Sequence, residues 1–230
     1  MTEPRTGTPR ERYRAHVRDE VKKHAWEQIG TAGAAALSLN AIAKRMGMSG
    51  PALYRYFANR DELITELIRD AYRDLADTVR ARAAADAGLD GLAQALRRWA
   101  LDDPQRYFLI YGTPVPGYHA PEDTTRISQE IMGMVLDAAC AAAEQRPVPA
   151  RALDEHLAEH RAWAGEHPAA PSALRQALTF WTRLHGVLSL ELAGQFSGMG
   201  FDPALLYAAE TEAVTGGTPS GHGDAPRPGR

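Results

Sequence analysis

Residues 36–63, ALSLNAIAKRMGMSGPALYRYFANRDEL, hold the most informative pattern in the chain. Ser38 is a suitable N-cap for a short helix, because its hydroxyl can accept a hydrogen bond from a backbone amide that the helix itself leaves unpaired. The apolar residues that follow recur at the three- and four-residue spacing of one buried helical face: Leu39, Ile42, Ala43 and Met46. Gly47 supplies a tight turn after them. The pattern predicts a helix over residues 39–46.

A second helix is expected over residues 50–57, with Ser49 as its cap. Its inward side carries Leu53, Tyr56 and Phe57, and its outward side carries Gly50, Pro51, Ala52, Tyr54 and Arg55. Two short helices joined by a glycine turn form a helix-turn-helix, whose second helix enters the major groove of DNA. The small residues that open this helix allow close approach but cannot make bidentate hydrogen bonds to bases. Base reading therefore falls on Lys44, Arg45 or Arg55, or on DNA shape.

Phosphate contacts can come from the groups around this motif. Tyr54 can donate its hydroxyl to a phosphate, and Arg60 places a cation at the start of the next helix, where backbone amides also favour an anion. Ser38 can clamp the opposite phosphate strand. A hairpin used only for packing is the alternative, and the basic character of this part of the chain opposes it.

Charge is distributed unevenly along the 230 residues. Residues 1–60 hold 11 Lys and Arg against 5 Asp and Glu, an excess of +6, whereas the remaining residues hold 15 against 24, an excess of −9. Such an asymmetry fits a basic module that meets a polyanion, joined to an acidic body that does not.

The whole chain is predicted to be all-α, because apolar residues repeat at three and four rather than at two. The first helix is expected over residues 11–31, with Val17, Val21, Ala25 and Ile29 buried and Arg14, Arg18, Lys22 and Lys23 on its other face. Further helices are expected over 60–84, 89–101, 104–111, 124–144, 150–164, 172–196 and 203–214. Composition predicts a disordered arm over 1–9 and a disordered tail over 215–230.

Composition also limits the class of protein. No stretch approaches the roughly 18 apolar residues of a membrane span, and the N-terminus lacks the apolar segment of a secretion signal, so a cytoplasmic protein without a membrane partner is expected. Cys140 is the single cysteine, which excludes an internal disulfide and a cysteine-based metal cluster. We expect no cofactor.

One string invites a catalytic interpretation. His156, Glu159 and His160 match the H-x-x-E-H pattern of inverted zinc peptidases. A catalytic zinc also needs a third protein ligand and an enclosing cleft, and the surrounding run ARALDEHLAEHRAW is short and polar. A solvated helix face explains the same residues, so we expect neither an enzyme nor a metal site.

The motif resembles that of the TetR/AcrR family of transcriptional regulators. The resemblance is carried by Leu39-x-x-Ile42-Ala43, Gly47-Met48-Ser49, Ala52-Leu53-Tyr54-Arg55-Tyr56-Phe57 and Arg60-Asp61-Glu62-Leu63, within residues 15–80. It implies a three-helix DNA-binding domain over residues 10–60 and a helical ligand-binding and dimerisation domain over 61–214. It also implies a DNA surface made of Ser38, Lys44, Arg45, Ser49, Gly50, Pro51, Ala52, Tyr54, Arg55 and Arg60.

The C-terminal half is similar to a subset of such regulators marked by Trp-x-x-x-His-Gly. Trp181, His185 and Gly186 carry this pattern, together with the run from Tyr107 to Tyr118. Trp181 and His185 lie four apart on one helix face, where they can pack together and present polar edges to a cavity; core packing is the alternative. A small-molecule site could be lined by Trp99, Phe108, Tyr111, Met132, Trp181 and His185.

The resemblance further implies a homodimer through helices near 172–196 and 203–214. Apolar area for it is offered by Leu178, Leu184, Val187, Leu188, Leu190 and Leu192, although an intramolecular core would use the same residues. A dimer lets two copies of the helix-turn-helix over residues 39–57, called the reader below, bind half-sites related by two-fold symmetry. The expected function is therefore a repressor that binds a palindromic double-stranded operator and is released by a small-molecule effector.

Overall fold

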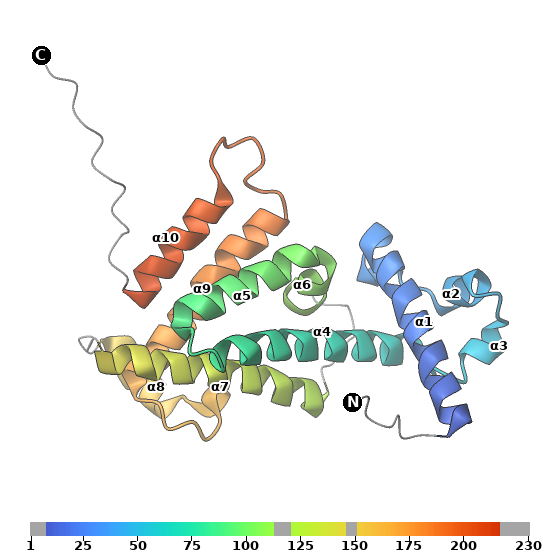
Figure 1. The fold of residues 1–230 in the computed structure, drawn as a ribbon, viewed down its shortest axis with the longest axis horizontal. Helices are drawn as coiled ribbons and strands as arrows, with labels where there is room; N and C mark the ends of the chain where they lie inside the picture. Colours follow the sequence, from blue (N-terminus) through green and yellow to red (C-terminus); the bar gives the residue numbers. More distant parts are fainter. Residues whose placement is uncertain (1–7, 113–120, 146–150, 217–230) are drawn as a thin grey trace, which may run out of the picture. The chain divides into compact units, whose positions relative to one another are not determined.

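The fold is known from a computed structural model, which describes residues 8–112, 121–145 and 151–216. Within these ranges all regular structure is helical, in ten α-helices and two short 3-10 helices (Figure 1), which confirms the all-α prediction. Packing divides the chain into two units, one made of residues 1–74 and 103–127 and the other of 75–102 and 128–230.

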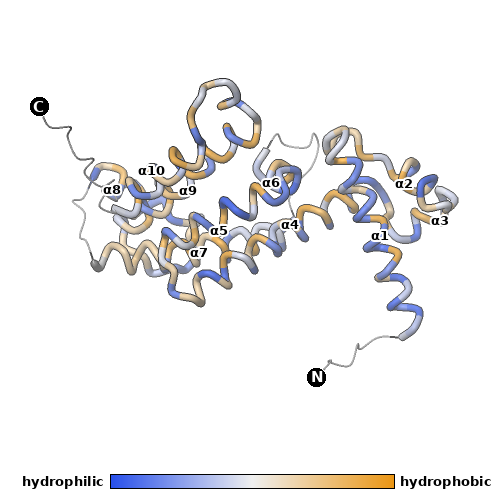
Figure 2. The backbone as a smooth tube through the Cα atoms, turned by 45° about the horizontal axis from the view of Figure 1, so that its top comes forward, coloured by the Kyte–Doolittle hydropathy of each residue, from blue (hydrophilic) through white to orange (hydrophobic). Residues whose placement is uncertain are grey.

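The first unit contains the predicted helix-turn-helix. Its elements are α1 (Pro9–Ala32), the 3-10 helix η1 (Ala34–Ala36), α2 (Leu39–Arg45), α3 (Gly50–Leu53), the first part of α4 (Arg60–Ala83), α6 (Pro104–Tyr111) and the start of α7 (Glu122–Gln145). Figure 2 shows apolar residues recurring along α1 and α4, as expected of helices that bury one side.

One apolar core holds this unit together. The predicted stripe of α1, Val17, Val21, Ala25 and Ile29, is buried there together with Ile42, Leu53, Phe57, Leu63 and Leu67. Leu109 of α6 joins the same cluster. Because Leu53 and Phe57 are fully buried, the position of the short helix α3 is fixed by packing and not by its own length.

The turn chemistry of the motif is confirmed in part. Ser38 caps α2, since its hydroxyl accepts a hydrogen bond from the Ala41 amide at 3.3 Å, and Gly47 has a φ of +68°, which a glycine adopts without strain. Ser49 stands at the N-cap position of α3, but its side chain makes no capping hydrogen bond. Helix α3 ends at Leu53 and not at residue 57, because residues 54–56 continue as turns.

The second unit contains the end of α4, α5 (Gly88–Asp102), most of α7, α8 (Ala152–Glu159), the 3-10 helix η2 (Ala162–Ala164), α9 (Pro171–Leu192) and α10 (Pro203–Thr215). The single helix predicted over 150–164 is wrong: His160 has φ −117° and ψ 60°, so α8 stops before it. Helix α9 ends at Leu192 and not at 196, where Gly194 turns with a φ of +72°.

Polar contacts tie the helices of the second unit to one another. Tyr207 of α10 is buried and donates its hydroxyl to the Ala93 carbonyl of α5 at 2.7 Å. Arg97 of α5 pairs with Glu191 of α9. These contacts fix α5, α9 and α10 against one another.

The two disordered segments expected from composition fall mainly on residues outside the described ranges. Of the described residues among them, Pro9 begins α1 and Thr215 ends α10. Gly216 follows α10 in the left-handed conformation, with a φ of 72°.

Candidate nucleic-acid interface

The predicted DNA-contacting residues of α2 lie at its two ends. Ser38 is half-buried at the start, where its backbone amide also donates to Gln28 Oε1 of α1 at 2.9 Å. Lys44 and Arg45 form the last turn and are exposed. Within the described part of the chain Lys44 makes no ion pair, so its ammonium is available to an outside anion.

Arg45 has an internal partner. Its guanidinium lies 2.8 Å from Glu27 Oε2 of α1. A hydrogen bond to His24 holds the pKa of Glu27 below its usual value, and the positive charge of Arg45 adds to that effect. Since Glu27 is ionised, a contact between Arg45 and DNA would compete with this ion pair.

The outward face of α3 is small at its start and polar at its end. Ser49, Pro51, Tyr54 and Arg55 are exposed, the Tyr54 side chain to 45%, and Ala52 is half-exposed. A Cβ on Gly50 would lie 3.3 Å from Asn40 Oδ1, so glycine lets the first turn of α3 approach α2 closely. The residues predicted to face DNA on α3 are thus exposed or partly exposed.

Arg60 is directed toward the protein itself. From the first position of α4 its guanidinium donates to the carbonyls of Ala34 at 2.7 Å, Ala35 at 3.2 Å and Leu37 at 3.2 Å. These carbonyls belong to η1 and to the segment just before α2. Arg60 therefore positions α2, whatever it contributes to phosphate binding.

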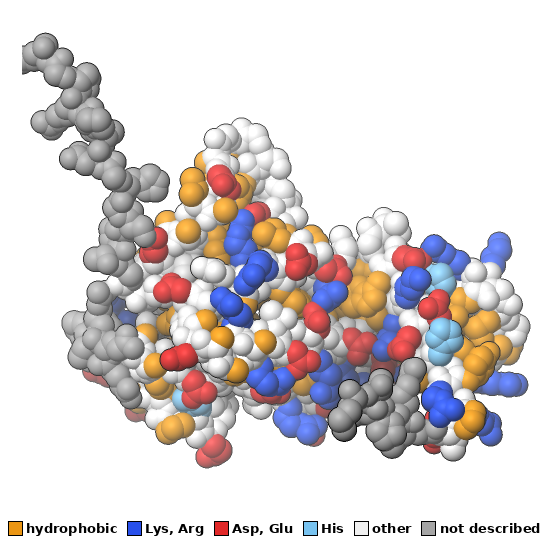
Figure 3. Space-filling model, in the orientation of Figure 1, with side chains coloured by type: hydrophobic (Ala, Val, Ile, Leu, Met, Phe, Trp, Pro, Cys, Tyr) orange, Lys and Arg blue, Asp and Glu red, His pale blue; other side chains and the backbone are white. Residues whose placement is uncertain are grey.

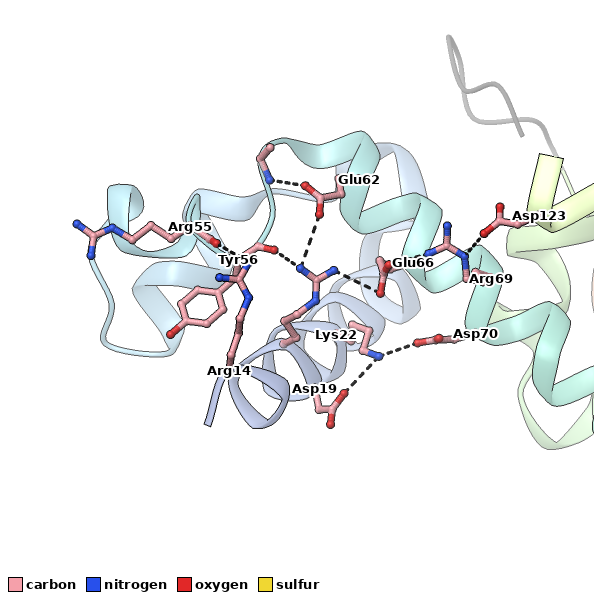
Figure 4. A network of polar contacts seen from close by, with 12 residues as sticks. Arg14, Asp19, Lys22, Arg55, Tyr56, Glu62, Glu66, Arg69, Asp70 and Asp123 are labelled. Atoms are coloured by element: carbon pink, nitrogen blue, oxygen red, sulfur yellow. Dashed lines mark hydrogen bonds and ion pairs between the residues drawn. The ribbon is translucent and has the colours of Figure 1, made fainter. Parts of the chain in front are cut away.

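Helix α1 holds the end of the reader through backbone atoms. Arg14 donates to the Arg55 carbonyl at 3.1 Å, and Arg18 donates to the Tyr56 carbonyl (Figure 4). The Arg18 guanidinium also stacks 4.1 Å from the centre of the Phe57 ring. It pairs with Glu62 at 3.6 Å and Glu66 at 3.4 Å on α4.

Other cations on this side of α1 are neutralised by α4. Lys22 lies 2.9 Å from Asp70 and 3.3 Å from Asp19. Burial by itself would lower the pKa of Lys22, but the contacts with the two carboxylates outweigh it and the pKa is raised. The cations that face α4 are thus paired, whereas Lys44 and Arg55 point outward. Figure 3 shows Lys and Arg side chains protruding around α1, α2 and α3.

The sequence interpretation missed a further cationic element, the first two turns of α1. Every residue from 8 to 16 is exposed, and burial begins only at Val17. This overhang, residues 9–16, extends past α2 and α3 in Figures 1 and 2 and carries Arg10, Arg12, Tyr13, Arg14 and His16. The stripe of α1 continues to Tyr13, which is exposed to 65%, so apolar spacing alone did not distinguish the overhang from the buried part of the helix.

The overhang is capped at its N-terminal end, before Arg14, which contacts the Arg55 carbonyl. Thr8 Oγ1 accepts from the Glu11 amide at 3.3 Å, the Thr8 amide donates to Glu11 Oε2 at 2.7 Å, and Pro9 opens the helix. Hydrogen bonds from Thr8 lower the pKa of Glu11. Such a reciprocal cap stabilises the end of a helix.

The residues predicted to bind an effector divide between the two units. Trp99, Met132, Trp181 and His185 belong to the second unit, and Phe108 and Tyr111 lie on α6 in the first. In the first unit, Tyr111 packs edge-on against Tyr72, with ring centres 6.0 Å apart. Burial raises the pKa of Tyr111 well above its usual value.

Trp181 and His185 pack on each other as the sequence predicts, with ring centres 4.3 Å apart. Burial lowers the pKa of His185 to about 4, so its imidazole is neutral near pH 7. Of the run from Tyr107 to Tyr118 that also carried the C-terminal resemblance, residues 113–118 lie outside the described ranges.

The H-x-x-E-H string lies at the end of α8. His156 and His160 are exposed and stack with ring centres 4.1 Å apart, and His160 is the residue at which the helix ends. In the described residues there is no group of three His, Cys, Asp or Glu side chains placed to hold a metal ion. No helix of the described chain is both long and apolar enough to cross a membrane.

A two-helix reader with exposed cations, carried by an all-helical chain, defines a helix-turn-helix DNA-binding protein. The family described as "Bacterial regulatory proteins, tetR family" matches residues 23–67, which include α2 and α3. The family described as "Tetracyclin repressor-like, C-terminal domain" matches residues 89–214. The chain belongs to the TetR family of transcriptional regulators, which are not enzymes.

Relatives in mycobacteria agree with this assignment. The HTH-type transcriptional regulator Rv1816 of Mycobacterium tuberculosis strain H37Rv is 36% identical over 218 residues, covering 87% of this chain and 92% of that protein. The HTH-type transcriptional regulator Mb1846 of Mycobacterium bovis gives the same values.

Solved structures share the fold. The crystal structure of the protein SCO4313 is 68% identical, covers 91% of this chain and 100% of that one, and has a TM-score of 0.84. A TetR/AcrR-family transcriptional regulator from Thermobifida fusca has a TM-score of 0.58 at 17% identity, covering 88% and 98% of the two chains, and supports the fold alone.

Proposed function

We propose that this regulator is a cytoplasmic repressor that binds a palindromic operator as a homodimer and leaves it when a small-molecule effector binds. The observation that carries the DNA side is the sorting of charge in the first unit. Cations that face α4 are paired with carboxylates, whereas Lys44 and Arg55 are exposed beside the small residues that open α3. A surface sorted in this way suits a polyanion.

The proposed DNA surface comprises Ser38, Lys44, Arg45, Ser49, Gly50, Pro51, Ala52, Tyr54 and Arg55. In it Tyr54 holds a phosphate and Arg45 reads a base once it leaves Glu27. Arg60 stays a proposed phosphate contact, with its positioning of η1 and α2 as the better supported role.

The proposed dimer uses α9 and α10. Leu184, Val187 and Leu188, considered above for this interface, are buried within one protomer, so they belong to its own core. Leu190 of α9 and Leu205 of α10 are exposed, Leu205 to 68%. Beside Leu205, Ala208 and Ala209 are also exposed on α10, and small side chains let a second helix approach closely. Dimerisation would cover this apolar face.

The effector is proposed to act on the second unit, with Trp99, Met132, Trp181 and His185 as candidate contacts there. Phe108 and Tyr111, on α6 of the first unit, stay predictions from the sequence. The contact between Trp181 and His185 supports an apolar site with a neutral imidazole. The Trp-x-x-x-His-Gly subset stays a prediction.

The division of labour on the DNA surface can be tested with two variants, after the preferred duplex has been selected from random DNA. Tyr54→Phe removes one phosphate hydrogen bond and should weaken all duplexes by a similar factor, about tenfold. Arg45→Ala should lower the affinity for the preferred duplex most and so reduce the ratio of that affinity to the affinity for duplexes with a single changed base pair. Titrations of labelled duplexes by fluorescence anisotropy measure both.

Arg98→Ala, which removes an exposed arginine of α5 in the second unit, is the matched control and should bind as the unaltered protein does. Equal losses on every sequence for both reader variants would contradict the assigned roles. Affinity for random duplex equal to that for the selected one would instead indicate an architectural DNA-binding protein.

A further inference from the structure

A cavity of about 530 Å³ lies within the second unit, lined by residues from the end of α7, from α8 with the residue before it, from α9, and from the end of α10 with the residue after it. This volume falls in the range of sites for small organic molecules. None of the six residues predicted from sequence to bind an effector lines it. The cavity is therefore a separate candidate site.

Among the described residues that line this cavity, the charged side chains are arginines: Arg151, Arg175 and Arg183. Arg175 is nearly buried and lies 2.6 Å from the buried Asp154, while Arg183 is half-exposed and lies 3.2 Å from Glu210. Burial by itself would raise the pKa of Asp154, but the hydrogen bonds from Arg175 and the Arg151 amide outweigh it and the pKa is lowered. Arg151 is exposed and makes no ion pair within the described part of the chain, so its positive charge is left for an outside anion.

Two buried polar atoms on the cavity wall have no hydrogen-bond partner among the described residues. The side-chain amide nitrogen of Gln176 donates a hydrogen bond to the Val214 carbonyl at 3.3 Å, whereas its Oε1 accepts no hydrogen bond from a described residue. Thr215 Oγ1 is likewise buried and unpaired. Buried polar atoms without partners are rare in folded proteins, because each costs free energy. A ligand could supply both partners.

The remaining wall is apolar, with Leu153 of α8 and Val214 of α10 among its residues. We propose that this cavity binds an organic anion: a carboxylate on a small apolar body that also carries a hydroxyl or amine. The carboxylate would face the arginines and accept from Thr215, and the hydroxyl or amine would donate to Gln176 Oε1. The apolar body would cover Leu153 and Val214.

Binding to the cavity stands by itself, whereas a role in releasing DNA rests on the proposed function. The cavity borders α9 and α10, the helices of the proposed dimer face, so occupancy can change how these helices pack. Binding and release are therefore measured separately.

The test uses the full chain and carboxylates of graded size: benzoate, salicylate, 2-naphthoate and indole-3-acetate, each beside its methyl ester. We expect at least one acid to raise the melting temperature and to bind with one-to-one stoichiometry by calorimetry, with its ester about tenfold weaker or more. The proposal is overturned when no acid binds better than its ester.

Site variants locate the binding. Arg151→Gln combined with Arg183→Gln should weaken the bound acid about tenfold or more, and Thr215→Val should weaken it several-fold. Arg175 is left intact because its removal would strand the buried carboxylate of Asp154. Arg98→Gln, an arginine of the same unit that does not line the cavity, should bind as the unaltered protein does.

Equal losses in the cavity variant and in Arg98→Gln would show diffuse attraction to a cationic surface and overturn the site. Melting temperatures of the unliganded variants show whether each is folded. If the acid binds in the cavity but leaves operator affinity unchanged, the site stands and effector release through it fails. If the protein binds DNA but none of the acids, the cavity proposal fails, whereas the proposed function as a DNA-binding regulator stands.

Discussion

Single arginines of the first unit differ in what their guanidinium groups hold. Arg18 touches a carbonyl, an aromatic ring and two carboxylates, and Arg60 holds three carbonyls. Arg55, on the other hand, is exposed, and within the described chain its backbone amide and carbonyl make hydrogen bonds whereas its guanidinium makes none. Arg55 and Arg60 lie in the motif that marks the family, and Arg18 lies on the helix before it; from sequence all three are simply basic residues of the N-terminal part. Their roles depend on which backbone carbonyls lie near them, a property that only the folded chain defines.

His185 makes a prediction about pH and stability. Its pKa is lowered to about 4 in the folded protein by burial, against 6.5 for an exposed histidine. Between pH 6.5 and 4 the unfolded chain binds a proton that the folded chain does not, so the free energy of unfolding should fall as pH decreases through this window. The contribution of this histidine is about 1.4 kcal/mol per pH unit at most. Above pH 6.5 it is constant.

The measurement is urea unfolding of the unaltered chain and of His185→Gln at several pH values from 4 to 8. Below pH 6.5 the free energy of unfolding of the variant should depend less steeply on pH, by up to the slope that one bound proton contributes. Thr182→Ala, an exposed position of the same helix, serves as the control. An unchanged slope in His185→Gln would show that the imidazole is protonated in the folded state.

At the scale of elements, helix α1 joins two kinds of helix in one. From Val17 onward it is a core helix with a buried stripe, and before Val17 it is a capped, cationic overhang. Apolar spacing predicted the core part, because spacing reports burial. It also predicted α2 and α4 closely. It failed at α3, because Phe57 is buried although the residues after Leu53 form turns and not a helix. It also failed at α8, because the polar residues around His160 give no apolar pattern that would mark the end of the helix.

If the cations of the overhang contact DNA phosphates, removing them should make DNA affinity depend less on salt concentration. Each phosphate neutralised by a cation adds about 0.9 to the slope of log affinity against log salt concentration. Arg10→Gln combined with Arg12→Gln removes two cations per protomer, so the slope for a dimer should fall by about 2 to 4. Duplex titrations between 50 and 300 mM salt measure it. The pair Arg73→Gln and Arg98→Gln, exposed arginines of α4 and α5, is the control. Parallel slopes for both pairs would place the overhang away from DNA.

At the scale of the whole molecule, the sequence predicted the class of protein better than its sites. The reader could be placed because its residues are close in sequence and its turn needs glycine. The cavity of the second unit could not, because Arg151, Arg175 and Thr215 come from distant segments that only folding brings together. The same holds for α6, whose Leu109 joins the core of the first unit across a long stretch of chain.

The proposed dimer makes the prediction at this scale. Leu205→Glu puts a charge on the exposed apolar face of α10, and two-fold symmetry would place it in the interface twice. The dimer dissociation constant should rise by about two orders of magnitude or more, while each protomer keeps its fold. Sedimentation equilibrium measures the assembly, and operator affinity should fall with it.

Leu101→Glu on α5, also at an exposed leucine, should leave assembly unchanged. A Leu205→Glu protein that sediments as the unaltered chain does would move the interface elsewhere.

The way the reader is anchored bears on how such a regulator can evolve. Arg14, Arg18 and Arg60 hold the motif through main-chain carbonyls, and Gln28 does so through the amide of Ser38. Every amino acid presents the same carbonyl, so mutations at 55 or at the start of α3 leave these anchors in place. Selection can therefore retarget the protein to a new operator without first rebuilding the scaffold. Descendants of one ancestral gene can diverge in the promoters they control while their architecture persists.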